Sequence, residues 1–271
     1  MFESDRPILL FCIPSAARVN DSYLSLVLGS IEAEMQRSQG IAPAPMRIEV
    51  LVIDVTPNTA RTDIRDARAR FAQVAFEPLA NKTREECTAA QLLSDSGGPG
   101  QPPCSVRQQT RDVTAALAQC AARVPADGWV ALVEDDTEMC EGALSTMPAA
   151  LPGLAREQRW RFVAFSNYFS GTTFAQPAAV AFAVHAAGRR GEKPIDHLVW
   201  DPWAPGEYLE TGGNLFAHRG RVSVFAYRNA AEFRELYDGM RFSARQSDCI
   251  GPASPELVNA MAAPAMTPAP H

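Results

Sequence analysis

The sequence has no hydrophobic run long enough to cross a membrane, because none approaches the roughly 18 apolar residues that a spanning helix needs. The apolar stretch near the N-terminus is short, follows acidic residues and ends at Pro14. These features are poor for a signal peptide and better for a buried strand. We therefore expect no membrane anchor within this chain.

Positive charge is also scarce. The 271 residues carry a formal net charge of −6, and the pI of the sequence is about 5.3. A broad nucleic-acid surface needs a basic stripe that neutralises phosphates, so nucleic acid is not an expected partner. A small phosphorylated ligand needs only a few well-placed cationic side chains, so the net charge does not exclude such a ligand.

The cysteines lack the spacing of a metal or redox motif. Six cysteines are present without a C-x-x-C pair, which argues against a zinc ribbon or a thioredoxin-like site. Cys12 lies in an apolar run and is expected to be a small core residue. Cys87 and Cys104 flank a loop rich in Ser, Gly and Pro, and the sequence leaves open whether they are bridged.

Buried strands alternating with amphipathic helices are what the sequence does contain. Residues 8–13 and 48–55 are apolar runs typical of strands that are buried on both faces. Each run is followed by apolar residues at helical spacing, over residues 24–35 and 62–74. This order is typical of an α/β protein with a mainly parallel sheet.

A polar segment interrupts this order and is predicted to be a mobile loop over residues 78–104. Later helices are expected over residues 113–124, 142–151, 178–187 and 194–200, and later strands over 128–133, 162–165, 215–218 and 222–227. The tail from residue 251 is rich in Pro, Ala and Met and is expected to be disordered. We therefore predict a single domain over residues 1–250.

The strongest local signal is the acidic triplet Glu134-Asp135-Asp136, which directly follows the strand predicted at 128–133. Ligands of open α/β sheets bind outside the carboxyl ends of the strands. Three adjacent carboxylates repel one another, and a hard divalent cation that also holds phosphates would relieve the repulsion. In an extended segment Glu134 and Asp136 point to one side and Asp135 to the other. The alternative is a solvated acidic turn.

Three further places strengthen the hypothesis of a phosphate and metal site. Pro14, Ser15 and Arg18 follow the first strand, where backbone N–H groups and an arginine can meet a base or diphosphate. Arg107, Arg111 and Asp112 lie at the start of the helix after the loop. His218 ends a predicted strand; it is either a hydrogen-bonded structural residue or, if it meets Asp136, a ligand suited to a manganese-like metal.

Six segments match one known family in order. They read IPSAARVNDSYLSLVLGSI (13–31), VRQQTRDVTAAL (106–117), WVALVEDDTEMCEGALSTM (129–147), RWRFVAFSNYFSGTTF (159–174), EKPIDHL (192–198) and NLFAHRGRVSVF (214–225). Together they resemble the N-acetylglucosaminyltransferase IV family, which branches the mannose core of N-glycans. The resemblance implies a GT-A fold for the domain 1–250 and an inverting glycosyltransferase that moves a sugar, N-acetylglucosamine by this likeness, from a UDP-sugar to a glycan acceptor. It also implies a divalent cation, Mn²⁺ or Mg²⁺, and a location in the Golgi or the lumen of the secretory pathway.

The same resemblance implies roles for single residues. It assigns the metal to Asp136 and His218 and the donor to Pro14, Ser15, Arg18, Asp54, Arg107, Asp112, Glu134 and Asp135. Asp196 is the expected catalytic base, with Asp201 and Asp238 as alternatives. The chain departs from the family at Gln108, where a lysine is usual, at Val113 for tyrosine and at His197 for tryptophan. These departures motivate one rival hypothesis, a non-catalytic nucleotide- or sugar-binding relative. A second rival is an unrelated metal-dependent phosphoesterase with the same acidic strand end.

Overall fold

The computed structural model describes residues 6–17, 23–38, 45–56, 60–80, 82–94, 100–166, 169–219 and 248–251. A seven-stranded sheet within them has the order β3-β2-β1-β4-β7-β6-β8. Its strands are β1 (Ile8–Ser15), β2 (Arg47–Asp54), β3 (Ala75–Pro78), β4 (Trp129–Leu132), β6 (Phe162–Ala164), β7 (Thr172–Ala175) and β8 (Tyr208–Glu210). β7 is antiparallel to β4 and β6, whereas the other neighbouring pairs of this sheet are parallel.

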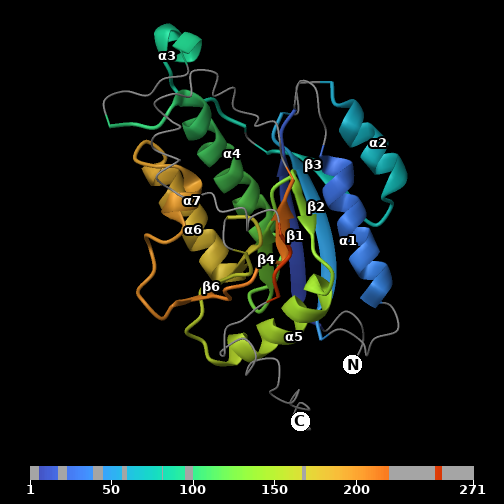
Figure 1. Cartoon of the computed structure of the whole chain (residues 1–271). Helices are drawn as coiled ribbons and strands as arrows, with labels where there is room; N and C mark the ends of the chain where they lie inside the picture. The colour runs from blue at the N-terminus through green and yellow to red at the C-terminus, as the bar shows by residue number, and fades with distance from the viewer. Residues whose placement is uncertain are drawn as a thin grey trace.

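Helices cover both faces of the sheet (Figure 1). One face packs against α1 (Leu24–Ser38), α2 (Thr62–Arg70) and α5 (Ala143–Arg156), and the other against α4 (Cys104–Ala121), α6 (Gln176–Arg189) and α7 (Ile195–Leu198). Because side chains alternate along a strand, Phe11 and Ile13 enter the first core and Leu10 and Cys12 the second. The predicted fold class, a mixed and mainly parallel sheet flanked by helices, is confirmed.

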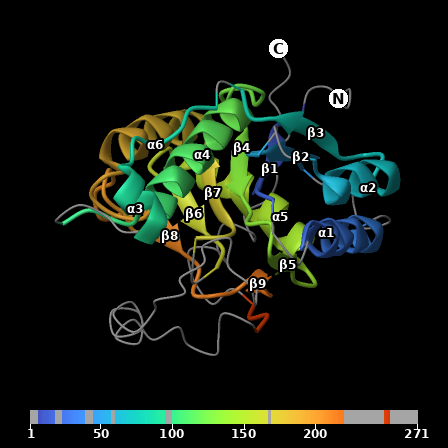
Figure 2. The same ribbon diagram turned by 90° about the horizontal axis from the view of Figure 1, so that it is seen from above.

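A second, two-stranded sheet lies beyond the carboxyl end of β4. It pairs β5 (Thr137–Met139) with β9 (Phe216–His218) in antiparallel register (Figure 2). β3, β5, β7 and β8 were not expected from the sequence, because each is short and mixes polar with apolar residues, so that no apolar run marks it. The strand predicted at 222–227 and most of the tail lie outside the described residues.

The loop predicted at 78–104 contains regular structure. The short helix α3 (Ala89–Ser94) lies within it, and α4 begins at Cys104, earlier than the apolar spacing indicated. A disulfide joins Cys87 to Cys104 and closes part of the loop, which settles the pairing that the sequence left open. The mobility of the loop stays a prediction.

Two further disulfides join segments that are distant in sequence. Cys12 of β1 is bonded to Cys120 of α4, and Cys140 is bonded to Cys249. The expectation that Cys12 is a small core residue is confirmed, because the residue is fully buried. Its disulfide was not expected; α4 packs against β1 and brings Cys120 to it. No pattern in the sequence marks this pair, because 108 positions separate the two cysteines. Among the described helices, none is both long and apolar enough to cross a membrane.

The double variant Cys12→Ala/Cys120→Ala is expected to lose about 2–5 kcal/mol of unfolding free energy, because the disulfide restricts a long segment of the unfolded chain. Urea unfolding of the wild type and the variant without reductant measures this loss. Equal stability would contradict the bond, as would free thiols titrated in the denatured, unreduced wild type.

Candidate functional site

The acidic triplet lies at the carboxyl edge of the main sheet. Glu134 follows β4 by two residues, and Val133 donates its N–H to the carbonyl of Cys12 in β1 at 2.9 Å. Because β1, β2 and β4 are parallel, their carboxyl ends meet at this edge and bring Ser15 and Asp54 to it as well. The edge is the position at which α/β sheets bind ligands.

Asp136 and His218 meet through the pairing of β5 with β9. The register sets His218 opposite Thr137, next to Asp136 in the chain. The imidazole Nε2 lies 3.4 Å from Asp136 Oδ2, and Arg219 donates its N–H to the carbonyl of Asp136 at 2.8 Å. The convergence on which the metal-site hypothesis depends is therefore present in the fold.

The backbone of the triplet is held by the segment that precedes β7. Glu134 donates its N–H to Ser170 Oγ at 3.1 Å, and the Thr137 hydroxyl lies 3.2 Å from the same oxygen. Gly171 has a φ of +83°, and a Cβ built there would lie 2.4 Å from a ring carbon of Phe216. The glycine therefore lets β9 pack closely enough for His218 to reach the triplet.

The neighbouring carboxyl groups of the triplet affect the pKa of Glu134. Burial is the largest cause that raises the pKa of this carboxyl, and the negative charge of Asp136 adds to it; together they raise the pKa to about 8. The charge of His218 opposes the shift, while Asp196 and Asp135 contribute to it. Without a cation, the site therefore carries fewer than the three negative charges of its carboxyl groups near neutral pH.

Asp135 turns away to the other side, toward β1. Ser15 Oγ donates to Asp135 Oδ2 at 2.8 Å, and the guanidinium of Arg61 donates to Ser15 Oγ at 2.9 Å. Arg61 also contacts Asp54 Oδ1 at 3.2 Å. Ser15, Asp54 and Asp135, three of the expected donor-binding residues, thus belong to one connected group, and Arg61 is a member that the sequence did not reveal.

A second polar group surrounds Asp112 on α4. Gln108 Nε2 donates to Asp112 Oδ1 at 2.9 Å, and Lys82 Nζ lies 3.4 Å from Asp112 Oδ2 while also donating to the carbonyl of Val55. Burial is the largest cause that raises the pKa of Asp112, and Lys82 and Gln108 oppose it. Lys82 therefore provides a cation close to Gln108, the position at which the family pattern has a lysine.

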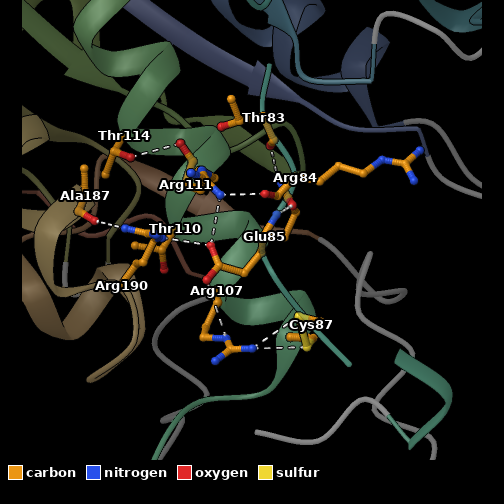
Figure 3. A network of polar contacts seen from close by, with 12 residues as sticks. Thr83, Arg84, Glu85, Cys87, Arg107, Thr110, Arg111, Thr114, Ala187 and Arg190 are labelled. Atoms are coloured by element: carbon orange, nitrogen blue, oxygen red, sulfur yellow. Dashed lines mark hydrogen bonds and ion pairs between the residues drawn. A yellow bond between two sulfur atoms is a disulfide. The ribbon is translucent and has the colours of Figure 1, made fainter. Parts of the chain in front are cut away.

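Arg107 is held by the loop and by a disulfide. Its guanidinium donates to Gln101 Oε1 at 2.6 Å and lies against both sulfurs of the Cys87–Cys104 disulfide. Figure 3 shows this arginine below Glu85, on which Arg111 and Arg190 converge at 3.4 and 2.8 Å. We name Glu85, Arg107, Arg111 and Arg190 the loop clamp, because they fasten the segment that carries Lys82 to α4 and to Arg190, which directly follows α6.

The three candidate bases are in different surroundings. Asp196, on α7, lies within electrostatic range of Glu134, and burial raises its own pKa. Asp201 is paired with Arg189 at 3.1 Å and with Lys193 at 2.7 Å. Asp238 and Arg18 lie outside the described residues. Pro14 is in β1 opposite Ile53, one residue before Ser15.

Asp136 and His218 fit a divalent cation that is also coordinated by a bound ligand. Among the residues described, no three His, Cys, Asp or Glu side chains are grouped so that they could hold a metal ion by themselves. Mg²⁺ in particular is usually held by one or two carboxylates together with substrate phosphates and water. A carboxylate and an imidazole at 3.4 Å are a mixed oxygen and nitrogen pair, which suits a manganese-like ion better than Mg²⁺ and leaves coordination positions for a diphosphate.

Comparison with solved structures finds partial likenesses. Two structures of S. aureus TarS have TM-scores of 0.33 and 0.35 at 15% and 13% identity; they cover 63% and 69% of this chain and 47% and 34% of theirs. A TarS structure in complex with UDP has a TM-score of 0.34 at 13% identity and covers 66% and 54%. The chain thus spans about a third to a half of those proteins, and TM-scores so low say nothing about its ligands. No family model and no curated protein matches the sequence.

Replacing Glu134 by Gln is expected to stabilise the protein in EDTA, because the amide removes a charge that burial and Asp136 disfavour. The folded pKa of about 8 lies above the ordinary value of 4.5, so the unfavourable ionisation grows between these pH values. The melting temperature should exceed that of the wild type by at least about 2 °C at pH 8, the shift that roughly 1 kcal/mol produces in a domain of this size. The gain should vanish near pH 4.

Glu138→Gln is the matched control, since this exposed side chain on β5 pairs with Arg219 and is two positions from Asp136. Thermal melts at both pH values measure the difference. A Glu134→Gln variant that melts like the wild type at pH 8 would contradict the crowding described above.

Proposed function

We propose that this protein is a metal-dependent glycosyltransferase that binds a UDP-sugar at the carboxyl edge of its sheet. The observation that carries the proposal is the meeting of Asp136 and His218 at the end of β4, beside a group of donors and acceptors on β1 and β2. A cation there would neutralise negative charge that develops on the departing diphosphate. Asp136 and His218 would hold it.

The donor would lie between the two polar groups of the edge. Asp135 and Asp54 offer carboxylates to hydroxyl groups of the nucleotide sugar, and Ser15 fixes the first of them. Arg61 places positive charge beside Asp54, and Lys82 places it beside Asp112. They offset part of the repulsion that an anionic diphosphate would otherwise meet from the acidic residues.

An inverting transfer needs a base that takes the proton from the acceptor hydroxyl. Asp196 is our candidate, because it lies near Glu134 and burial raises its pKa toward the range in which a carboxylate accepts a proton more readily. Asp201 is a poorer candidate, because two cations hold its carboxylate. N-acetylglucosamine as the sugar and a branching N-glycan as the acceptor rest on the resemblance of the sequence segments.

The site favours this proposal over the phosphoesterase hypothesis. That hypothesis requires Asp136 and His218 to lie apart or a second acidic cluster to complete a two-metal site, whereas the two side chains lie 3.4 Å from one another. The non-catalytic hypothesis predicts UDP binding without turnover. Lys82 beside Gln108 weakens its motivation, since a cation is available although the usual lysine position is not occupied by one.

The secretory pathway is the proposed location. Three disulfides pair all six cysteines of the chain. Such bonds form and persist in oxidising compartments and are rare in the cytosol. This supports a lumenal or extracellular setting, and the resemblance narrows it to the Golgi.

Asp136→Asn is expected to weaken Mn²⁺-dependent UDP binding at least about tenfold, because a neutral amide is a poorer ligand for a hard cation than a carboxylate. Calorimetric titration of UDP with and without Mn²⁺ measures the effect, and Glu138→Gln, two positions from Asp136, serves as the control. UDP binding by the wild type that ignores Mn²⁺, or an Asp136→Asn variant that binds normally, would remove the metal site from the proposal.

Asp196→Asn is expected to lower kcat by about 10²–10⁴-fold while the Kd for UDP stays unchanged, because a general base acts on the acceptor and not on donor binding. The assay follows UDP release from UDP-N-acetylglucosamine with a mannose-core N-glycan acceptor. Asp201→Asn is the comparison variant and should retain turnover. If Asp201→Asn lost turnover and Asp196→Asn retained it, Asp201 would be the base. A wild type that binds UDP without turnover would favour the non-catalytic hypothesis.

A further inference from the structure

Arg61 is a buried cation at the carboxyl edge of the sheet that no sequence motif marks. It directly precedes α2, and its side chain is 5% exposed. The negative charges of Asp63, Asp54 and Asp135 act on it and, together with the hydrogen bond to Asp63, outweigh the effect of burial on its pKa, which is raised. A buried arginine needs such partners, so its position is fixed from several sides.

The hydrogen bonds of Arg61 connect three elements. Nε and Nη2 bind the two oxygens of Asp63 in α2 at 2.8 and 2.6 Å. Nη1 donates to the carbonyl of Ser15 at the end of β1, at 3.1 Å, and to Asp54 Oδ1 at the end of β2, at 3.2 Å. This bidentate pair with additional acceptors is a rigid arrangement, because the planar guanidinium cannot rotate without disturbing several hydrogen bonds at once.

One further contact extends this arrangement into the triplet. Nη2 donates to Ser15 Oγ at 2.9 Å, and Ser15 Oγ donates to Asp135 Oδ2 at 2.8 Å. A guanidinium has no acceptor, so the hydroxyl must receive from Arg61 and give its single proton to the carboxylate. The direction of the chain from Arg61 through Ser15 to Asp135 is therefore determined by the chemistry of its members.

We propose that Arg61 is a positioning residue of the donor site: it orients the Ser15 hydroxyl, which holds the Asp135 carboxylate in place for the nucleotide sugar. This inference rests on the proposed function of the edge as a UDP-sugar site. It accounts for the different contacts of the adjacent carboxylates Asp135 and Asp136. Asp135 is drawn toward β1 by Ser15, whereas Asp136 faces His218 on β9.

A purely structural role for Arg61 would make a different prediction. Its pair with Asp63 fastens the start of α2, and loss of that pair alone would lower stability without a specific effect on UDP. An effect transmitted through Ser15 must instead disappear when the Ser15 hydroxyl is already absent. The energetic coupling between the two positions therefore separates the two roles.

The experiment uses the full chain with Mn²⁺ and UDP as the probe. Arg61→Lys keeps the charge near Asp54 and Asp63 but cannot maintain the forked contacts, and Ser15→Ala removes the hydroxyl while leaving Arg61 in place. Each variant is expected to bind UDP about tenfold or more weakly, the effect of losing a hydrogen bond to a charged group. The double variant should be no weaker than the weaker single variant.

Arg65→Lys is the matched control, since this exposed arginine of α2 pairs with Asp66 and should bind UDP like the wild type. A fold-change in the double variant that equals the product of the two single changes would overturn the inference. So would normal UDP binding by Arg61→Lys or Ser15→Ala, even with a lowered melting temperature. A wild type that does not bind UDP would instead remove the proposed function, and this inference with it.

Discussion

Three consecutive carboxyl groups at the end of β4 are the constraint around which this edge of the protein is arranged. Ionised carboxyl groups so close together repel one another, and this repulsion, together with burial, raises the pKa of Glu134. The fold separates them in space. Asp135 is bound by Ser15 and, through it, by Arg61, while Asp136 faces the imidazole of His218. A cation bound at Asp136 would relieve what remains of the repulsion.

The separation depends on two sheets that meet at this edge. Parallel strands bring the ends of β1, β2 and β4 together, and this delivers Ser15, Asp54 and the triplet to one place. The small sheet of β5 and β9 adds His218 from a distant part of the chain. Phe216 connects the two sheets, because it lies in β9 and packs close to Gly171, which directly precedes β7 of the main sheet. The site therefore depends on packing at a position where a side chain larger than that of glycine does not fit.

The segment from Lys82 to the start of α4 supports the other side of the edge. In the loop clamp three arginines lie around Glu85, and the disulfide between Cys87 and Cys104 closes the same segment. Lys82 is thereby kept close to Asp112 and Val55. In this arrangement Arg107, which the family resemblance assigns to the donor, supports the loop. The role of Arg107 as a donor ligand stays a prediction.

The sequence by itself determined the elements that have a clear period or a long apolar run. β1, β2, α1, α2 and β4 were predicted because burial on one or both faces leaves a repeating pattern, and the acidic triplet stood out because such charges rarely follow a buried strand. The short strands β5 and β7 mix polar with apolar residues and leave no such pattern, so they were missed. Contacts between distant positions leave none either, which is why the tertiary structure alone decided the Cys12–Cys120 bond and the chain from Arg61 through Ser15 to Asp135. The approach of His218 to Asp136 was anticipated only through the family resemblance, and the packing of β9 against β5 brings it about. Local patterns record how each segment is buried, whereas which side chains meet at the edge depends on how the segments pack together.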